Sequence, residues 1–260
     1  PSLTVLVPAT MEAIMREAGW ADADLSSLRM LSTGSSVVPT GLISAFEARG
    51  VPVVQVYGST ETCPIAVYQQ PGEGRTHPLS TGKTGLHCSV RLTDGRGQPV
   101  EGADKDGQIE VRGPNVMSGY WDQPEQTAEA MRGGWYHTGD AGYLDADGYG
   151  YLSGRIKDMI ITGGENVYPI EVEKVLDEHP AVHQVAVIGV PDAKWGERVH
   201  AVIQYRSETT ADDLIAYCRD RLAHYKCPKT MTLSADPLPL TRVNKIDKVA
   251  LRARHGGGTE

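Results

Sequence analysis

The feature that most constrains the fold is a stretch of apolar, β-branched residues, VPVVQVY, at positions 51–57. It is preceded by an apolar segment at residues 28–31, a turn rich in glycine and serine, and a segment at 41–49 with helical spacing of its apolar side chains. Strand, helix and buried strand in this order predict a right-handed βαβ unit with two parallel strands. The first part of the chain is therefore expected to contain an α/β sheet.

Polar residues follow both strands of this unit. Parallel strands end at the same edge of a sheet, and ligands of open α/β sheets bind just outside that edge. We therefore expect Thr33–Ser36 and Tyr57–Glu61 to be neighbours in space. The second segment belongs to the sequence YGSTET, which contains an aromatic ring, a glycine, hydroxyls and a carboxylate. The ring can stack on a base, a hydroxyl can bond a phosphoryl oxygen, and the carboxylate can hold Mg²⁺. An ordinary polar turn is the alternative interpretation.

The pattern changes after residue 80. Short strands then alternate with turns, and the pairs Asp94-Gly95 and Asp147-Gly148 are typical of hairpins. This alternation predicts a small antiparallel sheet or barrel, and we assign a small β-barrel to residues 81–155.

The last part of the chain has a mixed α+β pattern. A helix is expected from Pro169 to about His179, and a second helix is expected to be capped by Thr210 together with Asp213. We predict three regions: the βαβ sheet portion at 1–80, the barrel at 81–155 and a separate α+β domain at 156–260, with a disordered tail at 255–260.

Composition and charge narrow the function classes. The chain of 260 residues has 40% hydrophobic and 22% charged residues, as globular proteins do. The net charge of −8 divides into −7 for residues 1–155 and −1 for the remainder, so no basic nucleic-acid surface is expected. No apolar run approaches the roughly 18–20 residues of a membrane span, and no signal segment is visible. The four cysteines form no C-x-x-C pair, which favours reduced thiols in the cytoplasm.

Two further clusters of polar residues are candidates for chemistry. Residues 134–173 place Asp140, Arg155 and Lys157 among glycines, and Gly163-Gly164 would let a ligand approach the backbone. Residues 238–252 contain a loop with Lys245, a cation that could stabilise developing charge. The alternatives are a glycine-rich hairpin for the first cluster and a solvated basic face for the second.

Together these three segments resemble the AMP-forming, adenylate-forming superfamily of acyl-CoA synthetases, luciferases and peptide-synthetase adenylation domains. YGSTET is similar to its Y-G-x-T-E motif. HTGD and GRIKDMIITGGENVYPIEVE are similar to its nucleotide and hinge motifs, and TRVNK is similar to its terminal lysine motif. The resemblance covers nearly the whole chain and implies the C-terminal part of a large α/β domain followed by a small, mobile α+β domain.

The resemblance also implies residue roles. Gly34, Ser35 and Ser36 would border adenine and the acyl group, where the family often has Gly-Gly-Ala. The remaining implied roles are adenine stacking by Tyr57 with Gly58 beside it, an acyl border at Ser59, phosphate binding by Thr60, Mg²⁺ binding by Glu61, ribose binding by Asp140 and Arg155, a hinge at Lys157, and adenylation catalysis by Lys245. For CoA, the resemblance implies the Gly163-Gly164 face, Trp195 and Tyr225. Asn244 stands where glycine is common, and Cys227 replaces a basic residue of some relatives.

The reaction implied by the resemblance uses ATP, Mg²⁺ and CoA. A carboxylic acid, fatty or aryl, is activated to an acyl-AMP and then transferred to CoA as a thioester, while Lys245 moves away as the small domain rotates. The chain is expected to be a fragment that does not turn over alone, because the family's phosphate-gripping loop is not within it. The alternatives are an adenylation module that loads a carrier protein and a non-catalytic nucleotide-binding remnant. A homodimer is left open.

Overall fold

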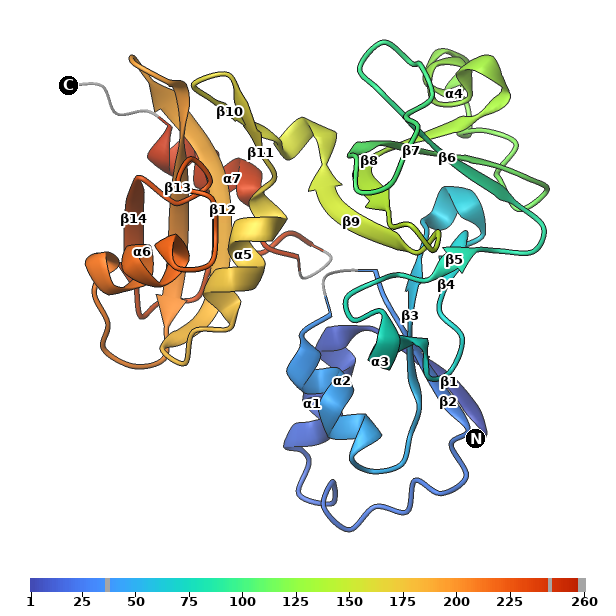
Figure 1. Cartoon of the computed structure of the whole chain (residues 1–260). Coiled ribbons are helices and arrows are strands. Elements are labelled where there is room, and N and C mark those ends of the chain that lie inside the picture. Colours follow the sequence, from blue (N-terminus) through green and yellow to red (C-terminus); the bar gives the residue numbers. More distant parts are fainter. Residues whose placement is uncertain (36–37, 243–244, 257–260) are drawn as a thin grey trace. The chain divides into compact units, whose positions relative to one another are not determined.

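The computed structural model describes residues 1–35, 38–242 and 245–256, and the chain divides into two compact units, Pro1–Leu152 (unit 1) and Ser153–Glu260 (unit 2). The division falls within strand β9 (Gly150–Arg155), three residues before the expected boundary after Arg155. Each unit contains sheet structure and its own helices (Figure 1).

Unit 1 begins with a five-stranded sheet in the order β1-β2-β3-β4-β5. The strands are β1 (Leu3–Leu6), β2 (Met30–Thr33), β3 (Val53–Tyr57), β4 (Val67–Tyr68) and β5 (Lys83–Thr84). The first three are parallel, and helix α2 (Thr40–Glu47) connects β2 to β3, so the predicted βαβ unit is present. Helix α1 (Pro8–Arg16) connects β1 to β2 in the same way, and the short helix α3 (Glu73–Thr76) lies between β4 and β5.

The core of this sheet lies between the strands and the helices α1 and α2. Met11 of α1 and Phe46 of α2 are at most 2% exposed and pack with Leu31 of β2 and Val53 of β3. Removal of these apolar side chains from water stabilises the parallel strands. The carboxyl ends of β2 and β3 are thereby held at one edge.

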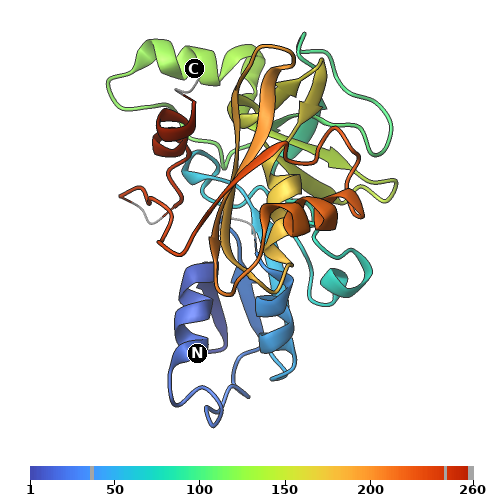
Figure 2. The same ribbon diagram turned by 90° about the vertical axis from the view of Figure 1, so that its left-hand side faces the viewer.

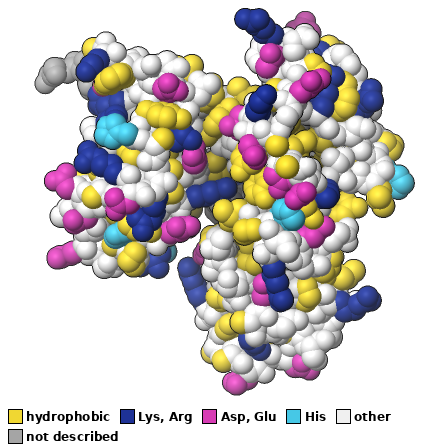
Figure 3. Space-filling view, viewed as in Figure 1, with side chains coloured by type: hydrophobic (Ala, Val, Ile, Leu, Met, Phe, Trp, Pro, Cys, Tyr) yellow, Lys and Arg dark blue, Asp and Glu magenta, His cyan; other side chains and the backbone are white. Residues whose placement is uncertain are grey.

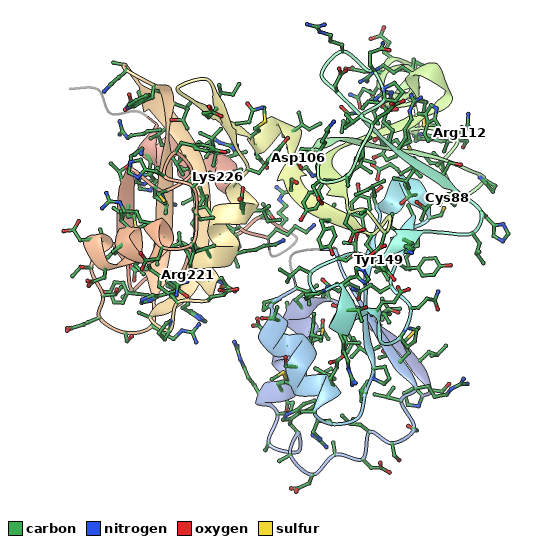
Figure 4. All side chains as sticks on the ribbon, in the orientation of Figure 1. Cys88, Asp106, Arg112, Tyr149, Arg221 and Lys226 are labelled. Carbon is green, nitrogen blue, oxygen red and sulfur yellow. The ribbon has the colours of Figure 1, made fainter. Side chains whose placement is uncertain are left out.

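A second sheet of unit 1 is antiparallel, in the order β6-β7-β8-β9. It contains β6 (Ser89–Thr93), β7 (Gly107–Arg112), β8 (Tyr136–Leu144) and β9, with helix α4 (Pro124–Ala130) and the 3₁₀ turn η2 (Arg132–Gly134) between β7 and β8. Hydrogen bonds join these four strands into one sheet in the region where the sequence predicted a small barrel. The phenol of Tyr149, labelled in Figure 4, donates a 2.9 Å hydrogen bond to Glu73 and ties the β8–β9 hairpin to α3.

Unit 2 contains a sheet in the order β11-β10-β13-β12, with β14 paired in parallel to β13. The strands are β10 (Ile160–Thr162), β11 (Glu165–Val167), β12 (Val182–Asp192), β13 (Gly196–Tyr205) and β14 (Thr230–Ser234). The helices are α5 (Pro169–Asp177), α6 (Ala211–Arg219) and α7 (Lys248–His255), and the 3₁₀ turn η3 (Ile156–Asp158) precedes β10. The predicted cap of α6 is present, since the Thr210 hydroxyl accepts from the backbone N–H of Asp213 at 3.1 Å.

Strand β12 is apolar on both of its faces. Val185 and Val187 belong to a core with α5 and α6, whereas Ala186 and Ile188 belong to a second core that includes Leu251 of α7. Figure 2 shows α7 and α6 on opposite sides of these strands. The continuous apolar run VAVIGV is therefore that of a strand covered on both sides.

Three general predictions can be compared with the structure. Among the described residues, no helix is both long enough and apolar enough to cross a membrane. All four cysteines are free thiols. The tail was expected to be disordered from residue 255, but His255 is the last residue of α7, and residues 257–260 lie outside the described part.

Candidate functional site

The end of β3 carries the first part of the candidate site. Tyr57 is 8% exposed, and its phenol donates a 2.8 Å hydrogen bond to Oδ2 of Asp140 on β8, 83 positions later in the chain. Two residues that the sequence assigned to the same nucleotide are therefore in direct contact in unit 1.

Two glycines allow the backbone segments at this edge to approach closely. A Cβ on Gly34, after β2, would lie 2.3 Å from the carbonyl oxygen of Val56 in β3. A Cβ on Gly58 would lie 1.8 Å from the carbonyl oxygen of Pro64. Neither position can hold a side chain without movement of the backbone. Gly34 thus lies against β3 one residue before Tyr57, in line with the predicted neighbourhood of the two strand ends.

The loop after β2 adopts an uncommon backbone conformation. Ser35 has φ = 72°, a left-handed conformation that glycine adopts more easily than serine. Ser36, which the sequence also assigned to the nucleotide and acyl site, lies outside the described residues. The hydroxyl oxygen of Thr33, directly before Gly34, is buried without a hydrogen-bond partner in the described structure.

The segment 59–62 is fixed by its own hydrogen bonds. Residues Thr60–Thr62 form the 3₁₀ turn η1, and the Thr62 hydroxyl accepts from the Ser59 backbone N–H at 2.9 Å. The side chain of Asn115 donates to the Thr62 carbonyl at 3.0 Å, and the Met117 N–H donates to the Glu61 carbonyl at 2.8 Å. Thr60 is exposed on this anchored turn.

Glu61 has a partner that the sequence did not indicate. Its Oε1 accepts a 3.0 Å hydrogen bond from the phenol of Tyr120, 59 positions away. Burial, together with the neighbouring Glu61 carboxylate, raises the pKa of Tyr120, so this phenol remains a donor at neutral pH. The pair holds the Glu61 carboxylate in one orientation.

A β-bulge directs Asp140 toward Tyr57. Glu110 of β7 is opposite His137 of β8, but Gln108 is opposite Ala141, so residues 138–140 are opposite Ile109 alone. The Thr138 hydroxyl fills the irregularity, since it donates to the Ile109 carbonyl at 2.8 Å and accepts from the Asp140 N–H at 3.1 Å. Gly139, with φ = 71°, provides the left-handed conformation of the bulge.

A buried ionic cluster lies beside this bulge. The carboxylate of Glu110 is 1% exposed, lies 2.7 Å from Arg91 Nη2 and 3.0 Å from His137 Nδ1, and accepts from the Thr93 hydroxyl at 2.7 Å. The nearest part of β8 is therefore fixed to β6 and β7. The sequence indicated none of these residues, because their pairing depends on strand register.

In unit 2, the predicted glycine pair forms a tight hairpin turn. Gly163 and Gly164 join β10 to β11 as a two-residue loop, with φ values of 61° and 87°, as a type I′ turn requires. The Gly163 N–H donates to the carbonyl of Trp195 at 2.8 Å, and a Cβ on Gly163 would lie 2.7 Å from the Trp195 ring. The structure therefore brings together two of the residues assigned to CoA.

The Trp195 ring is half-exposed and has a cation above it. It is 43% exposed, with Nζ of Lys194 at 4.5 Å from its centre, and the Asp192 carboxylate accepts from the backbone N–H groups of both residues. Lys194 is a cation near the predicted CoA surface that the sequence reading did not include.

Tyr225 precedes β14 in the segment that follows α6. It is 38% exposed, and within the described residues no hydrogen bond, ion pair or ring contact joins it to Trp195 or Gly163. Its neighbour Lys226, labelled in Figure 4, pairs with Glu171 of α5 at 2.6 Å. Figure 3 shows basic and acidic side chains interspersed over the visible surface.

Three predicted residues of unit 2 are exposed. Arg155 is the last residue of β9, and Lys157 lies in η3. Lys245 closes a hairpin in which the Thr241 N–H donates to the Lys245 carbonyl at 2.7 Å, and Asn244 beside it lies outside the described part.

Comparison with known proteins places these residues in a family. The sequence model of the AMP-binding enzyme family matches residues 1–121, and that of the AMP-binding enzyme C-terminal domain matches residues 171–245. The chain belongs to the AMP-binding enzyme family. Tyr57 and Glu61 lie within the first match, and Lys245 ends the second.

Relatives within this family extend beyond the chain. It is 46% identical over 254 residues to the indoleacetate–CoA ligase of Aromatoleum aromaticum. That alignment covers 96% of this chain and 49% of the ligase. The o-succinylbenzoate CoA synthetase of Bacillus subtilis, solved with its acyl-adenylate intermediate, superimposes with a TM-score of 0.88 at 36% identity, covering 99% of this chain and 52% of the other. A structure of the same synthetase with ATP and magnesium ion has a TM-score of 0.84 at 35% identity, covering 94% and 50%. The chain therefore spans about half the length of these members of the AMP-binding enzyme family.

Proposed function

We propose that this chain is the C-terminal half of an AMP-forming acid–CoA ligase. The observation that carries the proposal is the Tyr57–Asp140 hydrogen bond at the end of β3, beside Glu61 on its anchored turn. In this proposal the whole protein activates a carboxylic acid with ATP and then forms a thioester with CoA. The same proposal implies that this chain is inactive by itself.

The residues at the strand ends fit a nucleotide. Gly34 and Gly58 keep side chains out of the space beside the backbone, and the buried hydroxyl of Thr33 has no hydrogen-bond partner among the described residues. The ring of Tyr57 offers a stacking surface for adenine. The carboxylate of Asp140 has two oxygens with about four acceptor positions, enough to accept from Tyr57 and from ribose hydroxyls as well. Arg155 is assigned a supporting role at the ribose.

Glu61 fits the magnesium ion that accompanies ATP. No cluster of three His, Cys, Asp or Glu side chains suited to a metal occurs among the described residues. Mg²⁺ in nucleotide enzymes needs fewer protein ligands, because one or two carboxylates act together with the substrate phosphates. When bound, the ion would neutralise charge on the phosphates, while Tyr120 holds the Glu61 carboxylate in place.

Activation of the acid requires neutralisation of charge. The acid's carboxylate oxygen attacks the α-phosphorus of ATP, the bond to pyrophosphate breaks, and acyl-AMP forms. Both reactants are anions, so Lys245 would contribute a cation at the developing charge, and Thr60 would donate to a phosphate oxygen. In the second step the sulfur of CoA attacks the acyl carbon and AMP leaves.

The CoA surface is assigned to the Gly163–Trp195 contact. The turn at Gly163-Gly164 exposes backbone, and the Trp195 ring with Lys194 above it offers an aromatic face and a positive charge. Tyr225 is assigned to a second part of this surface. The aromatic acids in the names of the indoleacetate and o-succinylbenzoate relatives support an aryl acid as substrate, ahead of a fatty acid.

The experiment uses the full-length protein and measures the two half-reactions separately. ATP–pyrophosphate exchange is screened over aromatic, short, medium and long acids, and thioester formation is then measured with free CoA. Lys245→Ala should slow adenylation by roughly 10²–10³-fold, since it removes a cation from the developing charge. Lys105→Ala, which removes an exposed lysine of unit 1, is the matched control.

The outcomes separate the alternatives. Exchange without thioester formation from free CoA would favour a module that loads a carrier protein. No exchange with any acid would contradict the proposed ligase and favour a nucleotide-binding remnant. An unchanged exchange rate in the Lys245 variant would contradict the role of Lys245 in adenylation.

A further inference from the structure

Helix α7 begins three residues after Lys245 and is held by two ion pairs. Nζ of Lys248 lies 2.7 Å from Oε1 of Glu173 on α5. About one helical turn further along, Nη2 of Arg252 lies 2.8 Å from Oδ1 of Asp158. The Arg252 and Asp158 side chains are 33% and 19% exposed, so solvent screens their attraction less than that of a surface pair.

The Lys245 hairpin is continuous with this helix. Leu240 and Ile246 form an antiparallel bridge, and the Asp247 N–H donates to the carbonyl of Pro239 at 2.8 Å. The Asp247 side chain then caps α7 by accepting from the Ala250 N–H at 3.0 Å. Hairpin and helix share hydrogen bonds through Asp247, so a shift of α7 changes the position of the hairpin.

The partner of Arg252 belongs to a different functional element. Asp158 is the last residue of η3, the turn that contains Lys157, the predicted hinge residue. The ion pair spans 94 positions of the sequence and connects α7 directly to this turn. It lies entirely within unit 2.

We infer that Arg252 and Asp158 are positioning residues for Lys245, because their ion pair fixes α7, and with it the Lys245 hairpin, to the hinge turn. The inference rests on the proposed function, in which Lys245 acts in adenylation and not in thioester formation. Loss of the pair leaves the hairpin attached through Leu251 and Lys248 but frees the helix end near the hinge turn. A misplacement of about 1 Å at a reacting centre can cost about 10²-fold in rate.

The test compares Arg252→Gln with Arg254→Gln in the full-length protein. Arg254 is an exposed arginine of the same helix, so both variants lose one positive charge from α7. Arg252→Gln should lower the adenylation kcat by about 10- to 100-fold with little change in the KM for ATP. Thioester formation from a supplied acyl-adenylate should stay within about twofold in both variants, and so should adenylation in Arg254→Gln.

Asp158→Asn provides an independent second variant. It should reproduce the loss, and the double variant should be no slower than either single one, because the two side chains act through one contact. Arg252→Lys keeps the charge and should restore most of the rate. Hydrogen exchange in the 260-residue chain gives a readout without catalysis: the amides of Lys245 and Asp247 should exchange faster in Arg252→Gln than in Arg254→Gln.

Three results would overturn the inference: equal adenylation rates in the Arg252 and Arg254 variants, equal losses in both half-reactions, or additive losses in the double variant. Failure of the proposed function is recognised separately. If Lys245→Ala leaves adenylation unchanged, the role of Lys245 is wrong, whatever the Arg252 variant does.

Discussion

The phenol of Tyr57 and the carboxylate of Asp140 share a 2.8 Å hydrogen bond between two different sheets of unit 1. This bond connects the strand end that would carry adenine with the bulge that would carry ribose. It fixes the separation of the two groups before any ligand arrives. Such prior order lowers the entropic cost of binding.

Tyr57→Phe tests this connection. The variant keeps the ring and removes only the donor, so the KM for ATP of the full-length protein should rise by about tenfold, as loss of a hydrogen bond to a charged group costs about 1.5–3 kcal/mol. The control is Tyr151→Phe, since the Tyr151 phenol donates to Asp145 at 3.3 Å outside the site. Equal KM values in both variants would contradict the proposed role of Tyr57.

Gly58→Ala tests the close approach at the strand end. The new methyl group would lie 1.8 Å from the Pro64 carbonyl oxygen, and forcing atoms into a packed region costs about 1–3 kcal/mol. We expect a lower urea midpoint for the structure that contains β3. Gly41→Ala is the control, because a Cβ there has nothing within 4 Å and lies in α2, where alanine is favourable. A midpoint for Gly58→Ala as high as that of the control would exclude this steric explanation.

Trp195→Ala tests the assigned CoA surface. Loss of the aromatic face should raise the KM for CoA about tenfold, as aromatic contacts contribute about 0.5–1.5 kcal/mol beyond the area that they bury. The KM for ATP should not change. Trp121→Ala is the control, since Trp121 is 96% exposed on unit 1. If the KM for ATP rises as much as that for CoA, Trp195 does not belong to a CoA surface.

His200 makes the stability of unit 2 depend on pH. Burial, with the nearby charges of His255 and Arg198, lowers the pKa of His200 from its usual 6.5 to about 4. Between these values the unfolded chain binds the proton and the folded chain does not, so stability falls as the pH decreases from 6.5 to about 4. Hydrogen exchange of β13 amides at pH 7 and pH 5 measures the effect. His200→Gln should reduce the difference in exchange rate between pH 7 and pH 5. If that difference is the same in the variant, groups other than His200 cause the pH dependence.

Much of the first sheet could be predicted from local pattern. The β-branched run of β3 and the glycine after α2 indicate a parallel unit, and parallel strands must end at one edge, so the neighbourhood of Gly34 and Val56 follows. The Gly163-Gly164 turn is likewise a local preference. The sequence reading assigned no element to residues 1–27, where β1 and α1 lie.

The supporting contacts could not be predicted, because they depend on register. The bulge at residues 138–140 appears only when β7 and β8 are paired, and the Glu61–Tyr120 contact joins side chains 59 positions apart.

The contact between Glu173 and β12 has a consequence for association. β12 is the terminal strand of its sheet, and the N–H of Val187 donates to Oε1 of Glu173 at 2.7 Å. A terminal strand with unpaired backbone groups is a template for another chain, and natural proteins protect such edges. Here a carboxylate from α5 already occupies the middle of the edge, and the Arg206 side chain covers its beginning by donating to the Val182 carbonyl at 2.7 Å. If the protein forms a homodimer, continuous strand addition along β12 is the arrangement that these two side chains disfavour.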